Sequence, residues 1–225
     1  MAVPPVRAAG GCGVVTPSDT FTFQRPPDPM PLTRRSLLAV LLSTPALTWA
    51  QGDAVVVEGK AFARRVEVAG AELLLNGTGV RAVAWFKGYA AGLYLRSRAS
   101  TAAQVVVLPG PKRLQLVMLQ KVPAEEFVKA FRKGLKRNTP DAELPQLAER
   151  MAQFEALVAA IGTVQKGDVV NLDFEPGRGM AFSLNGTLRG EAIAGEEFYA
   201  ALLRSFVGDR PYDRELRAGL LGQRN

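Results

Sequence analysis

The sequence has 225 residues and a formal net charge of +7, and 48% of its residues are hydrophobic and 22% charged. This length suits one domain, and the mild positive surplus suits small anionic ligands or membrane surfaces but is too weak to indicate nucleic-acid binding. The chain has no histidine and a single cysteine, Cys12. Zinc sites, histidine-ligated haem and nucleophiles of the Ser/His/Asp or Cys/His type are therefore disfavoured, and we expect no metal or cofactor.

Residues 30–50 have the layout of a bacterial export signal. Arg34 and Arg35 precede an apolar run that is too short to span a bilayer, and Ala50 offers a small residue for cleavage. The Sec and Tat routes both remain open, and the alternative is a buried or amphipathic N-terminal helix. The expected divisions are a disordered leader or a start codon assigned too far upstream (1–29), a signal peptide (30–50), and a periplasmic or secreted domain without a transmembrane segment (51–225).

Short β-branched runs predict strands in the first half of this domain. They cover residues 54–58, 62–68, 72–75, 80–95, 105–108 and 112–119. Asn76-Gly77 and Asn185-Gly186 predict two tight hairpin turns, because both residue types tolerate positive φ. Gly88 and Gly92 predict kinks or bulges within the long 80–95 strand.

Apolar residues at helical spacing follow, interrupted by two further strands. The predicted helices cover residues 125–137, a segment capped by Asp141 and ended by Gly162, then 195–207 and 213–221, while 169–174 and 179–184 are the strands. This order predicts an α+β domain, in which one large, mostly antiparallel sheet carries a layer of helices on one side.

Arg81 lies in the apolar stretch from Gly79 to Leu95. A side chain that is always ionised is costly to bury unless a partner meets it. The sequence leaves three partners open: an internal carboxylate, water at the sheet edge, or an anionic ligand. Lys87, in the same stretch, is expected at an exposed turn or bulge.

Six short motifs, in this order, carry a resemblance to a known family. They are 75–81 (LNGTGVR), 87–95 (KGYAAGLYL), 111–114 (PKRL), 166–168 (KGD), 208–211 (GDRP) and 220–222 (LLG). Together they resemble the chalcone isomerase superfamily over nearly all of residues 54–222, and most closely its bacterial exported, chalcone isomerase-like branch. The resemblance implies an open-faced β-sandwich with a ligand cleft between a large antiparallel sheet and a helical layer.

The superfamily contains isomerases that close a flavanone ring and non-catalytic members that bind fatty acids. Arg81 stands where both groups have an arginine, and Tyr89 stands where the fatty-acid binders have a tyrosine and the isomerases a threonine. The isomerases have a Tyr and an Asn, seven residues apart, at the places where this chain has Phe127 and Gly134. Ser205 corresponds to an isomerase threonine, so one hydroxyl is kept while two polar side chains are lost.

The resemblance therefore implies a small amphipathic ligand, such as a fatty acid, and no chemistry. The expected ligand-binding residues are Arg81, Tyr89, Phe127, Phe131, Leu202, Ser205 and Phe206. One alternative is an intramolecular lyase acting on a chalcone-like substrate, with Arg81, Tyr89 and Ser205 as its catalytic candidates.

Another alternative is an envelope interaction module with a vestigial cleft. In that case the basic helix face, formed by Lys129, Arg132, Lys133, Lys136 and Arg137, would make peripheral contact with an anionic membrane or a partner. The plainer interpretation of that face is solvation.

Overall fold

The computed structural model of the chain describes residues 53–83 and 86–223, all of them within one compact unit, Thr48–Asn225. The predicted leader, the signal peptide and its cleavage site lie outside the described residues. Within the described part of the chain, no helix is long and apolar enough to cross a membrane.

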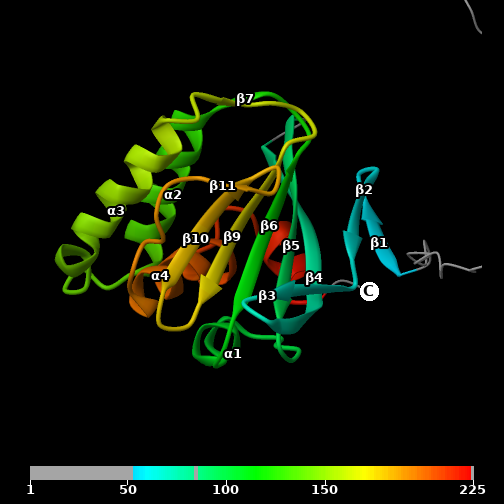
Figure 1. Cartoon of the computed structure of the whole chain (residues 1–225), viewed down its shortest axis with the longest axis horizontal. Coiled ribbons are helices and arrows are strands. Elements are labelled where there is room, and N and C mark those ends of the chain that lie inside the picture. Colours follow the sequence, from blue (N-terminus) through cyan, green and yellow to red (C-terminus); the bar gives the residue numbers. More distant parts are fainter. Residues whose placement is uncertain (1–52, 84–85, 224–225) are drawn as a thin grey trace, which may run out of the picture. The chain divides into compact units, whose positions relative to one another are not determined.

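The central element is a seven-stranded sheet in which every neighbouring pair is antiparallel, in the order β11-β10-β9-β6-β5-β4-β3 (Figure 1). Its strands are β3 (Arg65–Val68), β4 (Ala71–Val83), β5 (Phe86–Leu95), β6 (Lys112–Met118), β9 (Val169–Glu175), β10 (Gly179–Leu184) and β11 (Thr187–Leu188). Two small antiparallel pairs accompany it, β1 (Ala54–Val57) with β2 (Lys60–Ala63), and β7 (Val122–Pro123) with β8 (Thr163–Val164).

Five helices complete the described fold: α1 (Ala102–Val107), α2 (Ala124–Asn138), α3 (Leu144–Ala159), α4 (Glu196–Val207) and α5 (Arg214–Leu220). The sheet separates two apolar clusters, because alternate residues of a strand point to opposite faces. On β5, Leu93 and Leu95 pack with the helices, whereas Ala90 and Tyr94 pack with Phe62 of the β1–β2 hairpin. The α+β class and the one-sided helical layer are confirmed.

Four predictions in the first half of the domain are wrong, three about strands and one about a turn. Residues 80–95 form two paired strands instead of one, since β4 and β5 run antiparallel to each other. The 62–68 segment is divided between β2 and β3. Residues 105–108 do not form a strand, because the capping box of Thr101 and Gln104 begins helix α1 there and overrides the β-branched run that follows.

Asn76-Gly77 is not a hairpin turn but lies inside β4, where Asn76 forms a bulge. The buried Asn76 amide donates to the carbonyl oxygens of Ala99 (2.9 Å) and Leu220 (2.8 Å) and accepts from the Ala99 amide (2.8 Å). Asn76 therefore joins β4 to the segment after β5 and to the end of α5. The second predicted hairpin turn is confirmed, because Asn185 (φ 52°) and Gly186 (φ 79°) connect β10 to β11.

The helix predictions for α2, α4 and α5 agree with the structure to within about one residue at each end. Asp141 does not cap α3, which begins after Glu143 with a proline in its first turn. Asp213 caps α5, since its Oδ1 accepts the backbone N–H of Leu216 at 2.9 Å.

Candidate functional site

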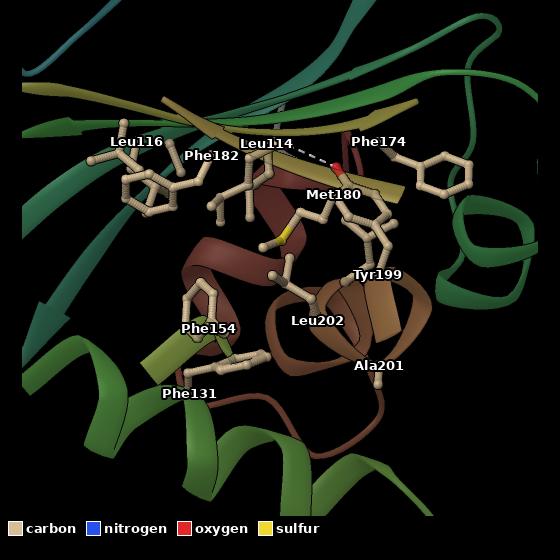
Figure 2. Packing of buried hydrophobic residues seen from close by; sticks show 14 of the residues in the cluster. Leu114, Leu116, Phe131, Phe154, Phe174, Met180, Phe182, Tyr199, Ala201 and Leu202 are labelled. Carbon is tan, nitrogen blue, oxygen red and sulfur yellow. Dashed lines mark hydrogen bonds between the residues drawn. The ribbon is translucent and has the colours of Figure 1, made fainter. Parts of the chain in front are cut away.

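A cavity of about 400 Å³ lies between the sheet and the helical layer. Most of the side chains that line it are apolar: Leu116, Val170, Leu172 and Phe182 from the sheet, Phe127, Phe131, Phe154, Val158, Leu202, Phe206 and Leu216 from the helices, and Ile161 from the turn after α3. Figure 2 shows Leu116 and Phe182 directed from the sheet toward Phe131 and Phe154 of the helices. This volume and lining are typical of a small-molecule site.

Several residues that line the cavity are exposed to solvent. These are Phe86 at the start of β5, Lys121 before β7, Pro123, and Glu126 and Ala130 on α2. The side chain of Phe86 is 42% exposed, which is unusual for a large aromatic residue. The exposed part of the cavity lining therefore lies at α2, at the start of β5 and before β7.

All seven residues predicted to bind a ligand line this one cavity. Arg81 and Tyr89 come from β4 and β5, Phe127 and Phe131 from α2, and Leu202, Ser205 and Phe206 from α4. The structure thus brings the whole set together. Their role in binding stays a prediction.

Arg81 and Tyr89 are direct cross-strand partners, which explains why they lie together. The Tyr89 ring stacks on Phe127, with 6.2 Å between ring centroids and 29° between planes. Burial raises the pKa of Tyr89 well above its ordinary value, Arg81 opposes this shift, and Asp213 adds to it. The phenol therefore stays protonated and can donate a hydrogen bond into the cavity.

Asp213 was not among the predicted site residues, although it lines the cavity. Its Oδ2 lies 3.4 Å from Arg81 Nη1 and accepts the backbone N–H of Ala82 at 3.0 Å. The internal carboxylate that the sequence left open as a partner of Arg81 is therefore present. From the sequence, Asp213 was only the first residue of the last predicted helix, and the tertiary structure places it beside Arg81.

The ion pair uses one nitrogen of the guanidinium group. Arg81 Nη1 also donates to the Ala82 carbonyl at 2.6 Å, and no hydrogen bond of Nε or Nη2 is formed with the described residues. The 3.4 Å separation from Asp213 exceeds that of a strong charge-assisted bond. Arg81 thus keeps donors for an anion even with Asp213 beside it.

Tyr212, also missed from the sequence, lies in the cavity lining next to Asp213. Three cations lie over its ring: Arg137 Cζ is 4.9 Å, Arg81 Cζ 5.2 Å and Lys133 Nζ 5.7 Å from the centroid. Lys133 and Arg137 are four residues apart on α2, so they share one face of that helix. This grouping extends the positive end of the cavity toward the surface.

Ser205 and Gly134 mark the closest approach of α2 and α4. The Ser205 hydroxyl donates to the Ala201 carbonyl oxygen at 3.1 Å, within its own helix. A Cβ atom at position 134 would lie 2.9 Å from Ser205 Cβ, so a larger residue does not fit without separating the helices. Neither position offers the cavity a side-chain donor that is free of partners.

In the described ranges, 53–83 and 86–223, no group of three or more His, Cys, Asp or Glu side chains is placed to hold a metal ion. The polar groups that line the cavity are cations, hydroxyls and two carboxylates, Glu126 and Asp213. Such a site can hold an anionic head group beside an apolar chain.

Comparisons with known proteins agree with this geometry. A family model described as chalcone isomerase-like matches residues 54–222. Among solved structures, a fatty-acid binding protein of Arabidopsis thaliana has a similar fold, with a TM-score of 0.56 and 15% sequence identity over 76% of this chain and 96% of that one. No curated protein sequence matches this chain. The match to the family model spans most of the chain and the whole of the sheet and helical layer, and the protein therefore belongs to the chalcone isomerase-like family.

Proposed function

We propose that this protein binds a fatty acid or a similar single-chain carboxylate in the cavity between the sheet and the helices, and that it performs no chemistry on its ligand. The observation that carries the proposal is the pairing of Arg81 with Tyr89 at the polar part of a cavity that is otherwise lined mainly by apolar side chains. A guanidinium group can donate two parallel hydrogen bonds to a carboxylate, and a protonated phenol adds another donor.

The apolar lining suits the chain of such a ligand. Each methylene group that leaves water contributes about 0.8 kcal/mol, and the aromatic side chains of α2 and α3 form a continuous surface, since Phe131 lies 4.8 Å from Phe154 between ring centroids. A structure of similar fold belongs to a fatty-acid binding protein. This relative supports the ligand class as an analogy.

Ring closure of a chalcone would need donors placed at the developing oxyanion. Phe127 and Gly134 supply no side-chain donor, and the Ser205 hydroxyl donates to Ala201. The loss of one oxyanion donor typically costs about 10²–10³ in rate. We therefore expect no measurable flavanone formation.

Calorimetric titration of the delipidated protein with dodecanoate tests the binding proposal. We expect saturable 1:1 binding, and Arg81→Gln is expected to weaken it about tenfold or more, because two charge-assisted bonds are lost. Tyr89→Phe keeps the ring on Phe127 and removes only the hydroxyl, so a smaller loss of about three- to tenfold is expected.

The matched control is Arg65→Gln, which removes an exposed arginine of the same sheet that pairs with Glu72. It should leave dodecanoate affinity unchanged. If wild-type protein takes up no dodecanoate, the binding proposal is wrong. Turnover of a chalcone that is abolished by Arg81→Gln would instead establish the isomerase alternative.

We also propose that the protein is exported and that its mature chain begins at Gln51. The support is the charge and hydropathy pattern of residues 30–50. Expression of the full chain in a bacterium, followed by fractionation and intact-mass measurement, should yield periplasmic protein that begins at Gln51. Full-length protein in the cytoplasmic fraction alone would contradict export.

A further inference from the structure

The basic face of helix α2 is not uniform in the structure. Lys129 Nζ lies 2.8 Å from Glu126 Oε1, and Arg132 donates twice to Glu155, at 2.9 Å and 2.6 Å. Lys133 and Arg137 lie over the Tyr212 ring instead. Neither of them has a carboxylate within ion-pair distance among the described residues.

The cations at Tyr212 are crowded. An aromatic ring has two faces, so at least two of the three cations over it share a face. The attraction of each cation to the ring is modest at a partly exposed site, while like charges gathered around one ring repel each other. The site would be stabilised by an anion.

The number of charges indicates which anion fits. Arg81, Lys133 and Arg137 bring three positive charges, and the one carboxylate within ion-pair distance of them in the described part of the chain is Asp213. Two positive charges therefore remain without a partner. A carboxylate ligand supplies one negative charge, whereas a phosphate monoester supplies about −1.5 to −2 at neutral pH and three acceptor oxygens.

The cluster is also continuous with the cavity, because Arg81 and Tyr212 both line it. We propose that Tyr212, with Arg81, Lys133 and Arg137, forms a head-group site for a phosphate monoester whose single apolar chain occupies the cavity. This inference rests on the proposed function, since it takes the cavity to be the binding site of the chain. It changes the preferred ligand class from a free fatty acid to a single-chain phosphate amphiphile.

The experiment compares two probes of equal chain length, dodecyl phosphate and dodecanoate, by calorimetric titration at pH 8 and below their micelle concentrations. We expect wild-type protein to bind dodecyl phosphate about tenfold or more tightly than dodecanoate. The double variant Lys133→Gln/Arg137→Gln should lose most of this preference, with dodecyl phosphate weakened about tenfold and dodecanoate less than about threefold.

The matched control is Lys129→Gln/Arg132→Gln, which removes the same charge from the same helix but from cations that already have carboxylate partners. It should change the affinity for both probes by less than about threefold. An equal loss of preference in this control would show that net charge decides the preference, and would overturn the Tyr212 site. Thermal melts of all variants establish that each one is folded.

Three other results would also overturn the inference. If dodecanoate binds and dodecyl phosphate binds no better, the phosphate site is wrong while the proposed function stands; if neither chain binds, both fail. Inorganic phosphate is the third probe and should bind far more weakly than dodecyl phosphate. Equal affinity for inorganic phosphate would assign the cluster to a free anion and would contradict a lipid head group.

Discussion

Two buried tyrosines differ in whether the hydroxyl group has a hydrogen-bond partner. The Tyr199 hydroxyl donates to the Leu172 carbonyl oxygen at 2.9 Å, the contact drawn as a dashed line in Figure 2. The Tyr94 hydroxyl lies in the apolar cluster on the opposite face of the sheet and has no hydrogen-bond partner among the described residues. A buried group without a partner lowers stability, because it has lost its hydrogen bonds with water.

We expect Tyr94→Phe to increase the free energy of unfolding by about 1 kcal/mol at pH 7, and Tyr199→Phe to decrease it by about 1 kcal/mol. Urea denaturation of the two variants, which lose the same atom, measures the difference. A larger destabilisation by Tyr94→Phe than by Tyr199→Phe would show that the Tyr94 hydroxyl has a partner.

Tyr94 also predicts a dependence of stability on pH. Burial raises its pKa from 10.0 to about 12, while the nearby Arg113 opposes the shift. Because the pKa of the folded state lies above that of the unfolded state, the contribution is fully present below pH 10 and is lost between about pH 10 and 12. The free energy of unfolding of Tyr94→Phe should therefore fall less steeply than that of wild type in this range, as measured by urea denaturation at several pH values. Equal slopes would contradict the raised pKa.

At the scale of elements, the position of the site depends on how α5 docks on β4. Gly77 and Gly79 of β4 face the end of α5, and a Cβ atom at Gly77 would overlap the carbonyl oxygen of Gly219, while one at Gly79 would lie 2.8 Å from the Leu216 carbonyl oxygen. Asn76 stabilises the same contact between β4 and α5, because its side-chain amide donates a hydrogen bond to the Leu220 carbonyl oxygen. This docking carries Asp213, the cap of α5, to Arg81.

Gly77→Ala should therefore separate α5 from β4 and lower the free energy of unfolding by about 2–3 kcal/mol. Gly88→Ala is the matched control in the same sheet, because a Cβ atom there would meet nothing closer than the Phe86 ring at 3.7 Å. The control should change stability by less than about 1 kcal/mol. Chemical denaturation gives both values, and equal effects would mean that the α5 contact is not tight.

At the scale of the whole described unit, the two faces of the sheet have different roles. On one face, the β1–β2 hairpin places Phe62 against Gly92 and Leu75. The helices cover the other face and leave the cavity between them and the sheet. A ligand in this cavity would pack against apolar side chains that have no packing partner there in the unliganded protein. Ligand binding should therefore raise the free energy of unfolding.

Dodecanoate at a hundredfold excess over its dissociation constant should stabilise the protein by about 2.7 kcal/mol, which corresponds to a rise in melting temperature of about 5–10 °C for a chain of this size. Differential scanning calorimetry measures this rise. Arg81→Gln at the same dodecanoate concentration should show a smaller one. An unchanged wild-type melting temperature would contradict binding to the native state.

The sequence by itself determined the fold class, the one-sided helical layer, three of the helices and the set of seven residues that line one cavity. The fold class and the helices follow from the hydrophobic period, which is a local property, whereas the seven residues follow from the resemblance to a known family that the ordered motifs carry. The tertiary structure decided that Asn76-Gly77 runs through a strand, that Arg81 and Tyr89 are paired across two strands, and that Asp213 and Tyr212 join them. Each of these depends on contacts between segments far apart in the chain, such as the 132 positions between Arg81 and Asp213, and no local pattern contains such contacts.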